Sequence, residues 1–179
     1  MVPADSFQGI NTARGRANLR ALTHDDTEDL RTLLNSLIDV GADIENDTHQ
    51  TIEEATSWVS RAMSGLEDGS EHHLIAEMDG EVIGRASIYR YPFECDKHMA
   101  DLGTMIRPGY WDLGLGSKML RIVMDQAREA GIEILFLIVF SSNLRAIHVY
   151  EKMGFKENGR IPSARACVSS GMAYTSTRS

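Results

Sequence analysis

The stretch "RPGYWDLGLGSKML" (residues 107–120) decides the fold of this chain. It places Gly114 and Gly116 at the start of an amphipathic segment, residues 116–131, whose apolar positions recur with the period of a helix. The N-terminus of a helix leaves about four main-chain N–H groups unpaired, and the helix dipole adds partial positive charge there. Glycine lets a ligand approach the main chain closely. Residues 111–117 are therefore predicted to hold a phosphate or pyrophosphate with main-chain donors.

The segments around this loop predict a layered α/β domain. An apolar run at residues 132–140 follows the helix and is expected to be a strand buried on both faces. With a strand expected at residues 96–106 it forms a βαβ unit, so these two strands should be parallel neighbours. Asp79 and Gly80 mark a hairpin within residues 72–91. The other expected elements are a strand at residues 18–22, helices within 23–41, 51–63 and 141–155, and two strands after residue 155.

Length and charge limit the classes of protein to which the chain can belong. Its 179 residues, 42% of them hydrophobic, predict one domain at residues 18–179 behind a flexible tail at residues 1–17. The net charge of −8 argues against nucleic acid as a partner, because binding to phosphates needs a cationic surface.

Cysteine and histidine usage predicts no metal site. Cys95 and Cys167 are far apart and form no CxxC pair, so reduced cysteines are expected. His72, His73 and His98 also lack metal-ligand spacing and are expected at surface or edge positions. No segment has the length of a membrane span or the pattern of a signal peptide. The expectation is a cytoplasmic protein that does not bind membranes.

Two common phosphate-binding loops do not fit the glycines. A P-loop needs Gly-Lys followed by Ser or Thr, whereas the order here is Gly116, Ser117, Lys118. A dinucleotide-binding loop needs G-x-G-x-x-G, but Met119 stands where the third glycine belongs. The loop therefore belongs to neither class.

The glycine loop instead resembles motif A of the GNAT superfamily (Gcn5-related N-acetyltransferases), which reads Q/R-x-x-G-x-G/A. Residues 111–116, "WDLGLG", match with one departure, because Trp111 stands where the family usually has Arg or Gln. The missing side chain removes a phosphate contact, and Arg107 and Lys118 are the nearby cations that can supply charge instead.

A second stretch, "NLRAIHVYEKMGF" (residues 143–155), is similar to motif B of the same family, N-x-x-A-x-x-x-Y-x-x-x-G-F. Its fixed positions are occupied by Asn143, Ala146, Tyr150, Gly154 and Phe155. Both motifs occur in the family order and are joined by the hydrophobic strand. On these residues the chain is identified as a member of the GNAT superfamily.

The resemblance implies the acyl-CoA N-acyltransferase fold, a central mixed and mostly antiparallel sheet with two parallel, splayed central strands flanked by helices. It also implies acetyl-CoA as co-substrate, with the pantetheine arm lying against the first splayed strand. The implied acetyl-CoA-binding residues are Thr104, Met105 and Ile106 through their main chain, Trp111, Asp112, Leu113, Gly114, Leu115, Gly116 and Ser117 in the loop, and Asn143 and Tyr150 on the later helix.

Two residues are candidates for catalysis. Asn143 and Tyr150 are seven positions apart, so they face the same side of a helix. The resemblance implies that the Tyr150 hydroxyl lies near the thioester sulfur, and a phenol with an ordinary pKa of ~10 can protonate the departing thiolate. Asp101, at a strand position where several relatives carry Glu, is the candidate base for the amine. A chain of waters, or a carboxylate that only attracts the acceptor, remains open as the alternative.

The expected function is transfer of acetyl from acetyl-CoA to a primary amine by direct attack in a ternary complex. A sensor or interaction module of the same fold, which binds acyl-CoA with little activity, is the alternative. A nucleotide-binding βαβ domain is a rival from another class. The acceptor is expected to be a small-molecule or protein amine that the sequence does not specify. A homodimer is expected only because many relatives dimerise.

Overall fold

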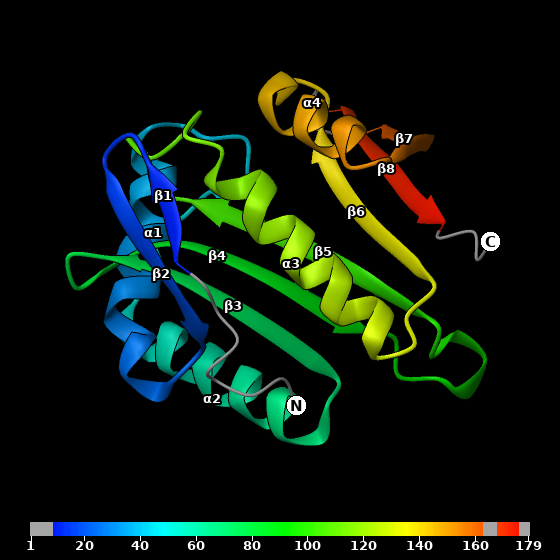
Figure 1. The fold of residues 1–179 in the computed structure, drawn as a ribbon, viewed down its shortest axis with the longest axis horizontal. Coiled ribbons are helices and arrows are strands. Elements are labelled where there is room, and N and C mark those ends of the chain that lie inside the picture. Colours follow the sequence, from blue (N-terminus) through cyan, green and yellow to red (C-terminus); the bar gives the residue numbers. More distant parts are fainter. Residues whose placement is uncertain (1–8, 163–167, 176–179) are drawn as a thin grey trace.

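The computed structural model describes residues 9–162 and 168–175. Its strands form one eight-stranded sheet with the order β1-β2-β3-β4-β5-β6-β8-β7 (Figure 1). All neighbouring strands are antiparallel except β5 and β6, which are parallel. The mixed, mostly antiparallel sheet and its parallel central pair are therefore confirmed.

The elements follow the expected order. The strands are β1 (Ile10–Thr12), β2 (Gly15–Ala21), β3 (Glu71–Met78), β4 (Glu81–Arg90), β5 (Met99–Ile106), β6 (Ile134–Phe140), β7 (Lys156–Pro162) and β8 (Val168–Thr175). The helices are α1 (Thr27–Asp39), α2 (Ile52–Asp68), α3 (Leu115–Glu129) and α4 (Leu144–Lys152), with short 3-10 turns η2 (His24–Asp26) and η3 (Glu94–Asp96).

The N-terminal part of the chain joins the sheet earlier than expected. Residues 10–12 pair with residues 15–17 as an antiparallel hairpin, within the range expected to be a flexible tail. Ile10 and Ala17 are buried in the core beside α3. Within residues 10–17 only Ile10, Ala13 and Ala17 are apolar, so the segment gives little sequence signal for a strand.

Two layers of helices cover the sheet, with α1 and α2 on one face and α3 on the other (Figure 1). Alternation along the strands supplies both cores. Leu74 and Ile88 belong to the core under α3, whereas Ile75 and Val82 belong to the core under α1 and α2. No helix in the described ranges is long and apolar enough to cross a membrane.

The parallel strands β5 and β6 stay together for only three residue pairs. Met99, Ala100 and Asp101 lie opposite Ile134, Leu135 and Phe136, and beyond them the strands separate. On its other side β6 pairs with β8 along its whole length. The separation confirms the expected splay and leaves one edge of β5, beyond Asp101, without a strand partner in the described part of the chain.

The expectation that β6 is buried on both faces is wrong. Leu135, Leu137 and Val139 are buried, but Ile138 between them is 58% exposed. The helices α1 and α2 pack mainly on β3 and β4, so they leave this face of β6 largely uncovered. The apolar residues on that face line a cavity instead.

Candidate active site

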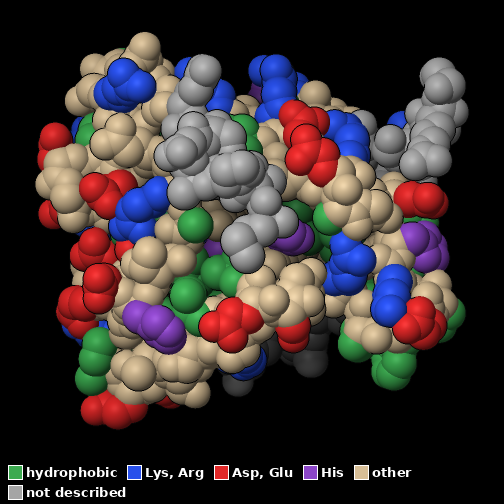
Figure 2. Space-filling model, turned by 60° about the horizontal axis from the view of Figure 1, so that its bottom comes forward, with side chains coloured by type: hydrophobic (Ala, Val, Ile, Leu, Met, Phe, Trp, Pro, Cys, Tyr) green, Lys and Arg blue, Asp and Glu red, His purple; other side chains and the backbone are tan. Residues whose placement is uncertain are grey.

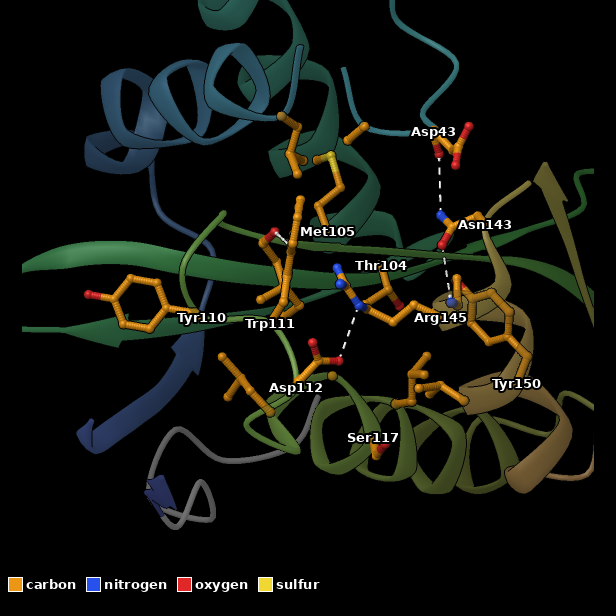
Figure 3. A pocket seen from close by; sticks show the side chains of 18 of the residues that line it. Asp43, Thr104, Met105, Tyr110, Trp111, Asp112, Ser117, Asn143, Arg145 and Tyr150 are labelled. Atoms are coloured by element: carbon orange, nitrogen blue, oxygen red, sulfur yellow. Dashed lines mark hydrogen bonds and ion pairs between the residues drawn. The ribbon is translucent and has the colours of Figure 1, made fainter. Parts of the chain in front are cut away.

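Two cavities lie at the place where β5 and β6 separate. One, which we call the α3 cavity, has a volume of about 340 Å³ and lies between the glycine loop, β5 and α4 (Figure 3). The other, which we call the α2 cavity, has about 510 Å³ and is lined from α2, β4, β5 and β6. The residues that line both, and so mark the junction, are Asp43, Ile44, Thr104, Met105, Asn143, Ala146 and Tyr150.

Most of the predicted binding residues come together around the α3 cavity. Those that line it are Thr104, Met105, Ile106, Trp111, Asp112, Gly114, Leu115, Gly116, Ser117, Asn143 and Tyr150. Leu113 lines neither cavity, and Asp101 lines only the α2 cavity. Motifs A and B therefore enclose one space, although about 30 residues separate them in the sequence.

The glycine loop leaves the start of α3 open. Gly114 is the N-cap at φ +74°, a conformation that favours glycine, and no side chain caps the helix. The first main-chain bond runs from Lys118 N to Gly114 O at 3.2 Å, so the N–H groups of residues 114–117 have no helical acceptor. A Cβ atom added at Gly116 would meet only Ile106 Cγ1, at an ordinary 3.7 Å. The space above these amides is therefore free for an anionic ligand.

Trp111, the departure from motif A, ties the loop to the end of β5. Its indole Nε1 donates to the main-chain oxygen of Ile106 at 2.8 Å. The Arg145 guanidinium carbon lies 4.6 Å from the Trp111 ring centroid, and Arg145 Nε lies 3.1 Å from Asp112 Oδ1 (Figure 3). The indole thus shapes the loop and supports a cation from α4.

The cations that sequence analysis suggested point elsewhere. Arg107 pairs with Glu81 at 2.8 Å, and Lys118 donates to the main-chain oxygen of Asn11 at 3.2 Å. Neither lines the α3 cavity, whereas Arg145 does. Sequence analysis missed Arg145, although its place in the first turn of α4, two residues after the motif B asparagine, was an available signal.

The open edge of β5 presents main-chain groups to the junction. The bond from Arg107 N to Ile83 O (2.9 Å) and the register show that odd-numbered residues of β5 bond to β4. The N–H and C=O groups of Thr104 and Ile106 therefore face the gap between β5 and β6. Met105 does not fit its predicted main-chain role, because its N–H and C=O face β4; its side chain lines the cavities instead.

Two side chains of motif B meet at the junction. Asn143 caps α4, since its Oδ1 accepts from Ala146 N at 3.1 Å. Burial raises the pKa of Tyr150 to about 12, and the nearby Thr104 hydroxyl lowers it only in part. Thr104 Oγ1 is itself buried, with no hydrogen bond of ordinary geometry to another described residue. The phenol is therefore a neutral donor that lies beside the Thr104 hydroxyl.

Asp101 lies on the α2 side of the junction. Its side chain is exposed, and its Oδ1 accepts from the Tyr91 hydroxyl at 2.9 Å. The Tyr91 ring stacks on Phe136 with a centroid distance of 6.3 Å. Burial, followed by the hydrogen bond to Asp101, raises the pKa of Tyr91. Asp101 thus reaches the α2 cavity but not the α3 cavity.

The surface or edge position expected for His73 is wrong. This side chain is buried between the rings of Trp58 and Tyr89, and its Nε2 lies 2.7 Å from Glu71 Oε2. Burial, helped by the charge of Arg85, lowers the pKa of His73 to about 3, so the imidazole is neutral. The described residues contain no cluster of three potential metal ligands. Cys95 is exposed, and Cys167 lies outside the described residues.

Comparison with known proteins agrees with this geometry. Residues 31–155 match the model of the acetyltransferase (GNAT) family. The amino-acid acetyltransferase of Vibrio vulnificus is 28% identical over 155 residues, which cover 86% of this chain and 31% of that protein. The spermidine N(1)-acetyltransferase of Escherichia coli is 30% identical over 97 residues, covering 54% of this chain and 51% of that protein. The chain thus spans about a third to a half of these relatives.

The fold has solved counterparts. The structure of yncA from Salmonella typhimurium, determined with acetyl-CoA, superposes with a TM-score of 0.77 at 21% identity, over 89% of this chain and 93% of that one. The family match covers more than half of the chain and includes the glycine loop and all of motif B. This chain therefore belongs to the acetyltransferase (GNAT) family.

Proposed function

We propose that this chain is an acetyl-CoA-dependent N-acetyltransferase that moves acetyl to a primary amine by direct attack in a ternary complex. The observation that carries the proposal is the meeting of two cavities at the open edge of β5, with Tyr150 at the junction. A thioester and an amine can reach this point from opposite sides. Relatives named as amino-acid and spermidine acetyltransferases support the same chemistry.

The α3 cavity fits acetyl-CoA. The unpaired N–H groups of residues 114–117 and the guanidinium of Arg145 would hold the pyrophosphate. The pantetheine arm would run along the gap-facing N–H and C=O groups of β5, as an added strand does. The Ile106 carbonyl already accepts from Trp111, so the arm begins pairing at Thr104.

The proposed reaction forms a bond from the amine nitrogen to the acetyl carbon and breaks the bond from that carbon to sulfur. An N–H group on the open edge of β5, with Thr104 as the first candidate, donates to the carbonyl oxygen as negative charge grows there. Tyr150 donates a hydrogen bond to the sulfur as it leaves with the electron pair. Because its pKa of about 12 exceeds that of a thiol, the phenol stabilises the thiolate mainly as a donor.

The amine loses its proton on the α2 side. Asp101 is the proposed acceptor, reached through water, because its carboxylate is exposed and held by Tyr91 rather than aimed at Tyr150. A base that works through water needs only to be within one solvent molecule of the amine. The acetylated amine and free CoA are the products.

Two measurements test this function. Acetyl-CoA should raise the melting temperature of the protein, whereas ATP and NAD should not; a shift with either nucleotide alone would support the nucleotide-binding rival. Release of free thiol with a panel of primary amines should then separate an enzyme from a sensor. Tight acetyl-CoA binding with no thiol release for any amine would contradict the proposed transfer.

A further inference from the structure

Arg85 on β4 is a half-buried cation that the proposed reaction does not use. Its guanidinium carbon lies 4.3 Å from the ring centroid of Trp58, and its Nε is buried with no acceptor among the described residues. Glu71 is the carboxylate whose charge reaches it, but Glu71 Oε2 bonds to His73. Arginine stays protonated in proteins, and burying an unpaired charge is costly. The remaining side of Arg85 faces the α2 cavity.

The register places Arg85 one strand away from the junction. Arg85 lies opposite Met105 in a hydrogen-bonded pair, in which Cα atoms are about 5.5 Å apart, and Met105 lines both cavities. Arg61 from α2 lines the same cavity. On the same face of the sheet, Ser87 Oγ is also buried without a partner in the described part of the chain. The α2 cavity is therefore lined by two arginines, Arg61 from α2 and Arg85 from β4.

We propose that the α2 cavity binds a free amino acid as the acetyl acceptor, with its carboxylate on the guanidinium of Arg85 and its amine at the junction. The inference rests on the proposed function and names its substrate class. The planar fork of arginine matches a carboxylate with two parallel hydrogen bonds. In an amino acid only a few bonds separate the carboxylate from the amine. Its carboxylate can therefore lie at Arg85 on β4 while its amine lies at the junction on the neighbouring strand β5.

The charge pattern of the cavity favours this zwitterion over a polyamine. The acidic residues that line the cavity, Asp43, Glu45 and Asp101, lie on the loop after α1 and on β5, whereas Arg61 and Arg85 lie on α2 and β4. A polyamine would bring cations against both arginines. Charged side chains of both signs are scattered over the face in Figure 2, and the chain as a whole is acidic at −8, so two arginines lining one cavity depart from the average charge of the chain.

The remaining lining suggests an apolar side chain on the acceptor. The β6 residues that line the α2 cavity include Ile138 and Phe140, whose side chains lie on the face of the sheet opposite to the core under α3. Leucine and leucinamide are therefore a matched pair of probes, because they differ only in the carboxylate. The amide has the less basic amine, which makes it the intrinsically more available nucleophile and biases the comparison against the proposal.

The test measures thiol release by the wild-type chain with L-leucine, L-leucinamide and spermidine, each with saturating acetyl-CoA. We expect kcat/KM for leucine to exceed that for leucinamide at least about tenfold, the effect of a charge-assisted contact. In the presence of CoA, leucine should also raise the melting temperature more than leucinamide does. Acetylation of leucinamide or spermidine as fast as leucine would overturn the inference and leave the proposed function standing. No thiol release with any amine would contradict both the inference and the proposed function.

A variant series assigns the effect to Arg85. Arg85→Gln should raise KM for leucine at least about tenfold and bring the leucine and leucinamide values together, while Arg85→Lys should retain part of the preference. KM for acetyl-CoA should change less than about twofold, because Arg85 does not line the α3 cavity. Arg121→Gln, on the exposed side of α3, is the matched control. An equal loss for both acceptors would assign Arg85 to packing. The wild-type comparison decides the matter if Arg85→Gln does not fold.

Discussion

The α3 cavity and the α2 cavity meet at Tyr150 but are built from different parts of the chain. In the α3 cavity the proposed ligand-binding groups are mainly main-chain N–H and C=O groups at a helix start and a strand edge. In the α2 cavity they are side chains from α2, β4, β5 and β6, such as Trp58, Arg85 and Asp101. A main-chain site needs glycines at set spacings and so leaves a motif, whereas a side-chain site can be assembled from distant positions without one.

The largest expected effect tests the main-chain nature of the α3 cavity. Gly116→Glu places a carboxylate above the unpaired amides and should raise the Kd for CoA about 100-fold or more. Its Cβ meets nothing closer than 3.7 Å, so the melting temperature of the free protein should stay within about 2 °C. Gly116→Ala should weaken binding far less. Isothermal titration calorimetry checks this. An unchanged affinity for CoA in Gly116→Glu would contradict the proposed position of the pyrophosphate at the loop.

Substitution of Tyr150 at the junction should change kcat rather than the affinity for CoA. Tyr150→Phe removes the donor to sulfur and should lower kcat at least about tenfold while the Kd for CoA changes less than about twofold. With the pKa of Tyr150 near 12, the wild type should show no alkaline loss of kcat from this group up to about pH 10. Steady-state rates across pH check both expectations. Unchanged turnover in Tyr150→Phe would remove the phenol from the mechanism.

A smaller effect is expected at Arg145, the one cationic side chain among the described residues that line the α3 cavity. Arg145→Gln should raise the Kd for CoA about fivefold, since the guanidinium is half-exposed and shared with Asp112. Higher salt should reduce the difference in the Kd for CoA between Arg145→Gln and the wild type. Arg107→Gln is the comparison, because its partner is Glu81 and its expected effect on CoA affinity is small. A larger loss in Arg107→Gln than in Arg145→Gln would reverse the assignment.

The pH dependence of stability should respond to His73, which packs between Trp58 and Tyr89 behind the α2 cavity. His73 has a folded pKa of about 3, below its unfolded value of ~6.5, so the unfolded chain binds more protons between these values. Stability from this group is complete above pH 6.5 and falls with pH, by about 2 kcal/mol between pH 7 and pH 5. Urea unfolding of wild type, His73→Gln and the exposed control His148→Gln at both pH values checks this. An equal pH dependence in all three proteins would contradict it.

Local sequence patterns predicted those parts of the fold that depend on residues close together in the sequence. The hairpin at Asp79 and Gly80, the helix after the glycine loop and the parallel pair β5 and β6 follow from turn chemistry and periodicity. The exposed face of β6 could not be read from its apolar run, because that face depends on which helices reach it. The hairpin β1 and β2 was hidden by its polar composition.

The candidate site divides in the same way. Gly114, Gly116, Asn143 and Tyr150 were predictable because each has a fixed place in a motif. The engagement of Met105 with β4 depends on the register between two strands, which no single segment encodes. The choice of Arg145 over Arg107 depends on which carboxylates lie near each cation in space. Arg85 gave no signal, since a lone arginine in a strand has no local pattern.

The unpaired edge of β5 has a consequence for the lifetime of the chain. Exposed strand edges are templates for intermolecular pairing, and ligand that occupies such an edge removes the template. A ligand present at a hundredfold excess over its Kd would add about 2.7 kcal/mol to the free energy of unfolding. Resistance of this protein to proteolysis and aggregation should then increase with the concentration of the thioester ligand proposed above.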